Sequence, residues 1–177
     1  MLTPIALVAG AVGWTLTEYL LHRFVFHNPR ARATLAVEHL KHHRIEGYFT
    51  PASEKASAAV VVIGALVGSG FLLGAPGFAF AFGFTATYLG YEVFHRRAHV
   101  APPPNRIGRW LRRHHLHHHF KNPQSNHGVT SPLWDLVFGT YEPSPVVAIP
   151  RPRAPGWLLD AAGDPDPRYA AEYRLLG

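Results

Sequence analysis

The sequence predicts an all-α integral membrane protein, with about three transmembrane helices and a cytoplasmic helical cap that carries a histidine-rich dimetal site. Two observations lead to this fold class. Residues 56–91 contain no Asp, Glu, Lys, Arg or His, and an uncharged run of this length is too long for one core helix of a soluble protein. The 177 residues also include 13 histidines and no cysteine, and most of these histidines recur at helical spacing.

The first predicted span covers about residues 2–21, "LTPIALVAGAVGWTLTEYLL", in which Glu18 is the one charged residue. A cleaved signal peptide is the alternative for such a segment. A signal peptide has a basic region before its apolar stretch and small residues at its cleavage site, and neither precedes "HRFVFH". We therefore expect this segment to remain in the membrane.

The uncharged run predicts a tight helical hairpin, with spans at about residues 56–74 and 76–95. The turn signal "GAPG" at residues 74–77 separates the two halves. Each span needs about 20 residues to cross the hydrocarbon core, so both helices must continue into their polar flanks.

The basic residues predict the orientation of the chain. With three spans, the six Lys and Arg residues between positions 22 and 55 and the eleven after position 95 lie on one side. The positive-inside rule makes that side cytoplasmic, with the N-terminus outside and the histidines on the cytoplasmic face. The charges then form a collar against the membrane, which argues against a nucleic-acid partner. The Ala, Arg, Gly and Pro content suggests a bacterial inner-membrane protein.

We expect a membrane domain over residues 1–141 and a Pro-rich cytoplasmic tail over residues 142–177. Within the first, "RWLRRHHLHHHF" predicts a helix that ends before "KNPQSNHG". Within the tail, "GWLLDAAG" at 156–163 and "PRYAAEYRLL" at 167–176 predict two short helices that pack on the cytoplasmic cap.

Ten histidines fall into four spaced clusters. These are His22 and His27; His39, His42 and His43; His95 and His99; and His115, His118 and His119. Residues three and four apart share a helix face, so each of the last three clusters can chelate from one face of its helix. His22 and His27 are about 140° apart on a regular helix. That pair therefore requires a helix end, a distortion or separate metals.

The absence of cysteine excludes iron–sulfur clusters, thiolate zinc sites and disulfides. Ten imidazoles exceed the needs of one ion and fit two. Carboxylates near such a site would orient the ring N–H groups, and each candidate lies near a cluster in the sequence. The candidates are Glu18, Glu38, Glu92 and Asp135.

The alternative for "HHLHHH" is a solvated tract that binds metal without specificity. His114 and His117 are the members most easily explained in this way. Because His114 and His118 are also four residues apart, spacing does not decide between His114 and His115 as a ligand.

In order, "EYLLHRFVFH", "HLKHH", "YEVFHRRAH", "HHLHHHF" and "GVTSPLWDLVFGTY" resemble the fatty acid hydroxylase/sterol desaturase superfamily over about residues 12–141. The last two motifs are most similar to those of fatty acid 2-hydroxylases. The resemblance implies a membrane-bound, non-haem di-iron oxygenase. Such an enzyme hydroxylates an unactivated C–H bond of a lipid, here most simply a fatty acyl chain, with O2 and external electrons.

The resemblance also implies a ligand set and partners. The implied ligands are His22, His27, His39, His42, His43, His95, His99, His115, His118 and His119. The implied cofactors are two iron ions, which zinc can replace in purified protein, and O2 is the co-substrate. The partners are the lipid substrate, the bilayer and a separate electron donor of cytochrome b or ferredoxin type. The motif "NHG" departs from fatty acid 2-hydroxylases, which typically have an aromatic residue in place of His127, so His127 is left as a ligand, a neighbour of the metals or a polar pocket residue. Asn126 and His114 are further candidates for a ligand or a neighbour of the metals.

Other functions remain open at this point. The same machinery serves as a carotenoid or sterol hydroxylase or desaturase. A non-enzymatic metal-binding or transport protein would place polar ligands at the bilayer midplane, where the predicted spans have none. A zinc hydrolase would carry H-E-x-x-H, whereas "HRRAH" has arginine at the position of that glutamate.

Overall fold

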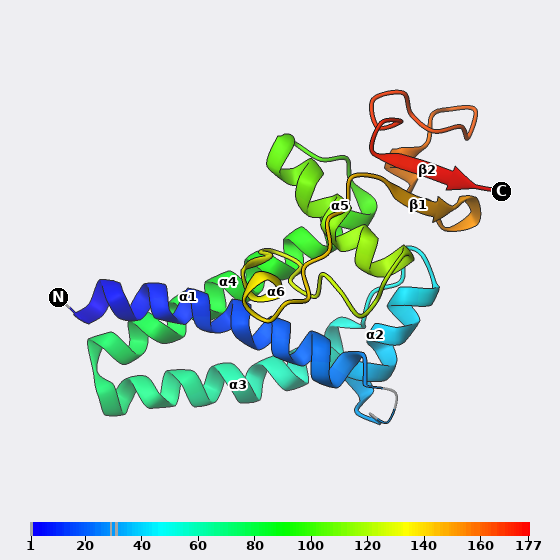
Figure 1. The fold of residues 1–177 in the computed structure, drawn as a ribbon. Helices are drawn as coiled ribbons and strands as arrows, with labels where there is room; N and C mark the ends of the chain where they lie inside the picture. The colour runs from blue at the N-terminus through cyan, green and yellow to red at the C-terminus, as the bar shows by residue number, and fades with distance from the viewer. Residues whose placement is uncertain (1, 29, 31) are drawn as a thin grey trace.

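A computed structural model of the chain describes residues 2–28, 30 and 32–177, and most of its elements are helices (Figure 1). The helices are α1 (Leu2–Leu20), which continues as a π-helix over Leu21–Phe26, α2 (Thr34–Arg44), α3 (Ala52–Leu73), α4 (Ala75–Val100), α5 (Arg106–Phe120) and α6 (Leu133–Val137). Strands β1 (Val147–Pro150) and β2 (Tyr173–Leu176) follow, with 3-10 turns at Arg151–Arg153 and Gly156–Leu158.

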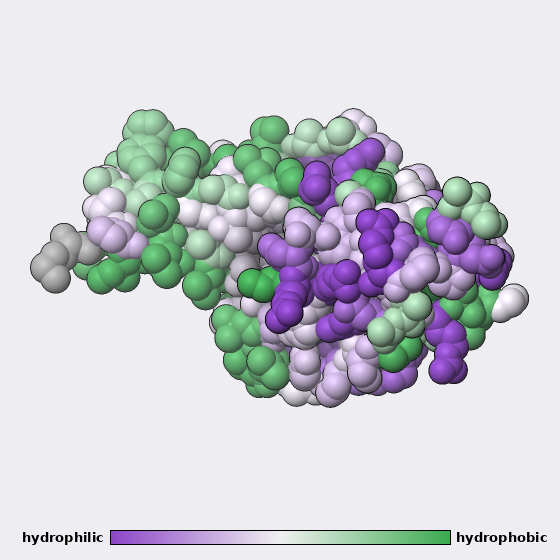
Figure 2. Space-filling view, turned by 90° about the horizontal axis from the view of Figure 1, so that it is seen from above, coloured by the Kyte–Doolittle hydropathy of each residue, from purple (hydrophilic) through white to green (hydrophobic). Residues whose placement is uncertain are grey.

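Helices α1, α3 and α4 form the apolar end of the molecule. Within the described part of the chain, two helices are long and apolar enough to cross a membrane, Leu2–Phe26 and Ala52–Leu73. Figure 2 shows hydrophobic side chains over this end and hydrophilic ones over the other. Helix α4 packs against both α1 and α3, but its C-terminal part carries charged residues. The third predicted span therefore stays a prediction.

The predicted hairpin turn lies between α3 and α4. Gly74 ends α3 with φ of 66° and begins α4, a left-handed conformation that glycine adopts at little cost. The proline of "GAPG" occupies the first turn of α4, where its missing N–H removes no helical hydrogen bond. Both helices extend past the predicted spans at their polar ends.

Two glycines allow α1 and α4 to approach closely. A methyl group on Gly83 would lie 2.1 Å from the carbonyl oxygen of Leu7, and one on Gly10 would lie 2.1 Å from that of Phe80. Backbone atoms cannot move aside as a side chain can, so the two helices must separate if either glycine gains a side chain.

Gly83→Ala is expected to destabilise the protein by about 1–3 kcal/mol, the usual cost of overpacking. The matched control is Gly90→Ala on the same helix, where an added methyl would meet no atom within 4 Å. Thermal unfolding of the detergent-solubilised variants measures the difference. Equal unfolding temperatures for the two variants would contradict the close approach.

The C-terminal residues form a small unit of their own that packs on α5. Strands β1 and β2 pair in parallel, with Val147 opposite Tyr173, and Val147, Ile149 and Leu158 bury their side chains against Leu116 of α5. The two helices predicted over 156–163 and 167–176 are wrong. The first segment contains a 3-10 turn at Gly156–Leu158 and then leaves the helical conformation. The end of the second, Tyr173–Leu176, is stabilised as a strand by pairing with Val147–Pro150, a partner some 26 residues earlier (Val147 to Tyr173).

Candidate metal centre

His22 and His27 are brought together by the π-helix at the end of α1. The backbone N–H of His27 donates to the carbonyl of His22, 3.2 Å away, five residues earlier. A π-helical turn places residues i and i+5 on one side, and the two ring centroids lie 5.1 Å apart. This distortion explains a spacing that a regular helix cannot accommodate.

The ten predicted histidines gather into two groups of five. Group A consists of His22, His27, His39, His43 and His118. Group B consists of His42, His95, His99, His115 and His119. Within each group the candidate ligand nitrogens all lie within 4.8 Å of one another. The groups are adjacent, because the rings of His43 and His119 stack with centroids 4.0 Å apart.

Each H-x2-H-H cluster divides between the two groups. On α2, His39 and His43 belong to group A and His42 belongs to group B. On α5, His115 and His119 belong to group B while His118 belongs to group A. Residues four apart point in nearly the same direction, and adjacent residues are about 100° apart. Each of these helices therefore contributes to both groups, and the expectation that each cluster chelates as a unit is replaced by this crossed arrangement.

The Nε2 atoms have the spacing of ligands around one ion. Four pairs lie 2.9–3.0 Å apart, including His42 with His95 and His99 with His115. Two nitrogens about 2.1 Å from one ion and at right angles are about 3.0 Å from each other. Among the described residues, the buried Nε2 atoms of His22, His43 and His119 have no hydrogen-bond partner. The donor set therefore fits two metal ions, one in each group.

Backbone carbonyls fix the tautomer of three of these rings. The Nδ1–H groups donate to the carbonyls of other loops: His22 to His127 at 2.5 Å, His42 to Tyr48 at 2.6 Å and His118 to Ser125 at 2.7 Å. Because a carbonyl only accepts, each Nδ1 carries the proton, and the Nε2 lone pair of the neutral ring is free for a metal.

Burial keeps the imidazoles neutral. Burial, and to a smaller extent nearby histidines, lower the pKa of His27 to about 4 and that of His42 to about 3. The pKa values of His39, His43, His115, His118 and His119 also fall, with burial as the largest cause. Neutral rings are the form that binds metal.

Metal-free protein is expected to lose stability as the pH falls from about 6.5 toward about 4. In this interval the unfolded chain takes up protons at histidines such as His27 and His42, whereas the folded chain does not. Each such residue lowers the free energy of unfolding by up to about 1.4 kcal/mol per pH unit. Unfolding midpoints of chelator-treated protein test this. A midpoint that does not change over the interval would contradict it.

Two of the four predicted carboxylates contact no imidazole that the structure describes. Glu38 binds Lys41 at 2.5 Å and also accepts from the Tyr48 hydroxyl, and Glu92 pairs with Lys55. Among the described residues, the carboxylate nearest a ring of groups A and B is that of Glu46, whose Oε1 lies 3.5 Å from Nδ1 of His99. Glu46 is not among the carboxylates predicted from the sequence, although it follows "HLKHH" within a few residues.

Glu18 and Asp135 hold the loop that supports His22. Asp135 accepts the backbone N–H groups of His127 and Gly128, each at 2.8 Å. Glu18 accepts from the N–H of Val129 at 2.6 Å. The carbonyl of His127 is thereby fixed where it receives the Nδ1–H of His22. These acids act on His22 through the backbone and not by direct contact with its ring.

The remaining candidates lie outside both groups. The ring of His127 is buried with its centroid 5.3 Å from that of His118. Asn126, with φ of 56°, exchanges hydrogen bonds with the backbone of Glu142. His114 faces Asp135 at 3.3 Å, and His117 faces Glu142 at 3.3 Å. None of these four residues belongs to group A or group B.

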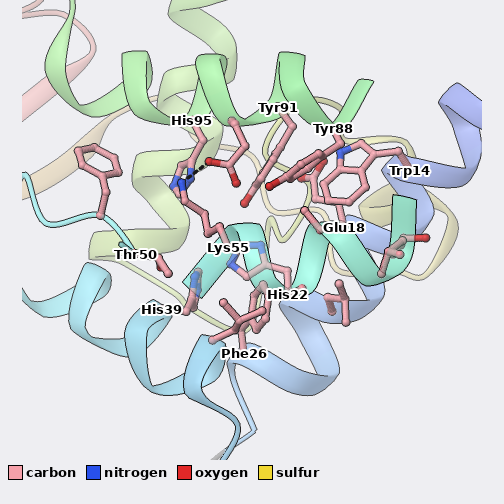
Figure 3. A pocket seen from close by; sticks show the side chains of 18 of the residues that line it. Trp14, Glu18, His22, Phe26, His39, Thr50, Lys55, Tyr88, Tyr91 and His95 are labelled. Carbon is pink, nitrogen blue, oxygen red and sulfur yellow. Dashed lines mark hydrogen bonds and ion pairs between the residues drawn. The ribbon is translucent and has the colours of Figure 1, made fainter. Parts of the chain in front are cut away.

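A cavity of about 170 Å³ lies between α1, α3 and α4 and reaches both groups. Its lining includes His22 and His39 of group A and His42 and His95 of group B. Figure 3 shows Trp14, Tyr88 and Tyr91 on one side of it and Lys55, paired with Glu92, close to His95. Apolar residues such as Ile63 and Phe84 line much of the rest. The cavity is therefore a largely apolar space that ends at the histidines of both groups.

The sequence model described as "Fatty acid hydroxylase" matches residues 7–140, which include all ten histidines of groups A and B. The chain belongs to the fatty acid hydroxylase family. The resemblance predicted from the ordered histidine motifs is thus confirmed.

Relatives in the fatty acid hydroxylase family come from plants, fungi and mammals. The chain is 33% identical over 142 residues to dihydroceramide fatty acyl 2-hydroxylase FAH2 of Arabidopsis thaliana, covering 74% of this chain and 58% of that protein. It is 35% identical to ceramide very long chain fatty acid hydroxylase SCS7 of Saccharomyces cerevisiae, with coverages of 75% and 36%. Identity to the fatty acid 2-hydroxylase of Rattus norvegicus is 34%, with coverages of 77% and 39%.

A solved structure shares the fold. It is described as full-length scs7p with only the hydroxylase domain visible, and it matches with a TM-score of 0.64 and 31% identity over 80% of this chain and 56% of that one. The chain thus spans about half the length, or less, of the family members it matches.

Proposed function

We propose that this chain is a membrane-bound di-iron oxygenase that hydroxylates a C–H bond of a lipid acyl chain. The observation that carries the proposal is the contact between an apolar cavity and two adjacent groups of five imidazoles. One atom of O2 enters the C–H bond, and the other leaves as water with two electrons and two protons. Family members named for fatty acyl hydroxylation, about one-third identical, support this choice over a carotenoid or sterol substrate.

Five imidazoles in each group favour iron over zinc. Structural zinc sites are almost always four-coordinate, whereas five nitrogens with one open position suit a six-coordinate ion such as ferrous iron. When bound, the two ions would activate O2 for attack on an unactivated C–H bond. Zinc in a purified sample would not contradict iron in the working enzyme, because imidazole binds both.

We further propose that the oxidised carbon is C2, next to the polar head of the acyl group. Lys55 and Glu92 lie in the cavity close to His95 (Figure 3), and polar groups at that end would bind the polar head of the substrate. The apolar lining beyond them would hold the rest of the acyl chain and exclude water. Relatives that carry the name 2-hydroxylase support the same position.

The proposed topology places the N-terminus outside and the histidine groups on the cytoplasmic side, because all 17 basic residues lie outside the proposed spans and on one side of them. Electrons would come from a separate protein of cytochrome b or ferredoxin type, for which a basic face suits an acidic partner. The bacterial inner membrane is an expectation from composition, and the compared relatives, which are eukaryotic, do not support it.

Iron-loaded, detergent-purified protein tests the proposal. Incubated with a reductant, ¹⁸O2 and lipids with long acyl chains, it should give a 2-hydroxyacyl product with one labelled oxygen atom. Two iron ions per chain are expected by elemental analysis. One ion per chain, or label from water in the product, would overturn the di-iron oxygenase. Hydroxyl at another carbon would overturn the C2 assignment alone.

A further inference from the structure

We propose that the C-terminal unit, residues 142–177, is a clasp that holds the ligand helices in position and slows the loss of metal. The proposal rests on the di-iron function above. The family match ends at residue 140, so the clasp is argued from the contacts of this chain alone. Its positioning residues are Arg153 and Trp157.

Arg153 reaches the end of α2. Its guanidinium donates to the carbonyl oxygen of His43, a member of group A. This carbonyl is among the last four of α2, which receive no hydrogen bond from a backbone N–H of the same helix. A cation there also interacts favourably with the helix dipole. The same guanidinium lies 4.8 Å from the ring centroid of Phe120, next to His119 on α5. One side chain therefore joins the ends of two ligand helices.

Trp157 makes the corresponding contact with α4. Its indole N–H donates to the carbonyl of Ala98 at 3.3 Å, one residue before His99 of group B and again within the last turn of the helix. Trp157 also lies 6.0 Å from the guanidinium of Arg112. Arg112 is 1% exposed and donates to the carbonyls of Arg97 and Ala101 at the same helix end. Together they fix the end of α4 against α5.

The hydrophobic core of the clasp packs against the face of α5 that carries Leu116. Leu116 is fully buried among Val147, Ile149 and Leu158. On the other faces of the same helix, His115, His118 and His119 enter groups A and B. The clasp therefore contacts each of the three helices α2, α4 and α5. The contacts of Arg153 and Trp157 lie within one residue of a histidine of group A and of group B, respectively.

Iron release tests the proposal in the full-length, iron-loaded protein. A chromogenic ferrous chelator is added, and the two release phases are followed alongside thermal unfolding. Loss of an outer partner of a ligand typically costs about 10–100-fold in metal affinity. Arg153→Ala is expected to speed one phase about tenfold, and Trp157→Phe, which keeps an aromatic ring but removes the N–H, to speed the other.

Arg151→Ala is the matched control. Arg151 lies in the same 3-10 turn but binds the carbonyl of Gly163 at 2.7 Å on the surface of the unit. It should release iron at the wild-type rate. Arg153→Lys keeps one hydrogen-bond donor, so its rate of iron release should lie between those of the wild type and Arg153→Ala. The release rate of this variant tests the proposal if Arg153→Ala does not fold.

Three outcomes overturn the clasp: wild-type release from the Arg153 variants, equal effects of Arg151→Ala and Arg153→Ala, or a lower unfolding temperature with unchanged release. Wild-type protein that binds no iron would instead overturn the proposed function. Wild-type protein that binds iron and hydroxylates lipid, together with any of the three outcomes above, would overturn the clasp alone.

Discussion

His118→Ala is expected to abolish hydroxylation and remove iron from group A, while His117→Ala, one residue away, retains most of the activity. His118 is fully buried, donates from Nδ1 to Ser125 and presents Nε2 2.9 Å from Nε2 of His27. Loss of a residue that hydrogen-bonds to a metal ligand typically lowers metal affinity or activity by about 10–100-fold. Loss of the ligand itself should therefore cost more than about 100-fold in product formed.

His117 is the control because it shares the helix, the burial and the residue type. Its Nε2 faces Glu142 at 3.3 Å, and it belongs to neither group. Glu142 keeps Asn122 and Lys121 as partners when His117 is removed. Elemental analysis, circular dichroism and product mass spectrometry on both variants separate metal loss from misfolding. An essential His117 with a dispensable His118 would show that the helix presents the wrong face to the metals in this structure.

The division of the histidines into two groups depends on tertiary contacts that the sequence does not predict. Helical spacing predicts that His39 and His43 point together and that His42 points about 100° away from His43. It does not predict what lies in either direction. The neighbours are His27 of the π-helix and His95 of α4, which are set by packing between segments far apart in the sequence. The sequence could predict that these ten histidines gather, but not how they divide between the two groups.

The same difference between local patterns and long-range contacts decides which parts of the fold the sequence predicts. The long apolar helices were predictable because an uncharged run of this length favours helices that cross a membrane, and the helices differ from the predicted segments mainly by extension at their polar ends. The C-terminal unit was not predictable, because Tyr173–Leu176 becomes a strand only in the presence of Val147–Pro150. Glu46 and the carbonyl of Tyr48 were missed for a related reason. Their contacts with His99 and His42 depend on a loop path and not on a periodic pattern.

Ala59→Trp is expected to reduce hydroxylation of long acyl chains by about 100-fold with both iron ions retained. Ala59 lines the cavity between α3 and the histidines, so an indole there occupies the space proposed for the acyl chain. A displacement of about 1 Å at the reacting carbon can cost about 10²-fold in rate. None of the histidines of groups A and B lies on α3, and iron content should therefore be unchanged. Shorter acyl chains should be affected less, because they need less of the cavity.

Val60→Trp separates occupation of the cavity from a general effect of tryptophan on α3. Val60 is 70% exposed on the outer face of the same helix, and in a bilayer its side chain would meet lipid, which accepts an indole readily. Activity and iron content of this variant should match the wild type. Rates measured over a series of acyl chain lengths distinguish the two outcomes. If Ala59→Trp hydroxylates long chains as fast as Val60→Trp does, the acyl chain does not bind in this cavity, and the substrate must approach the histidines along another path.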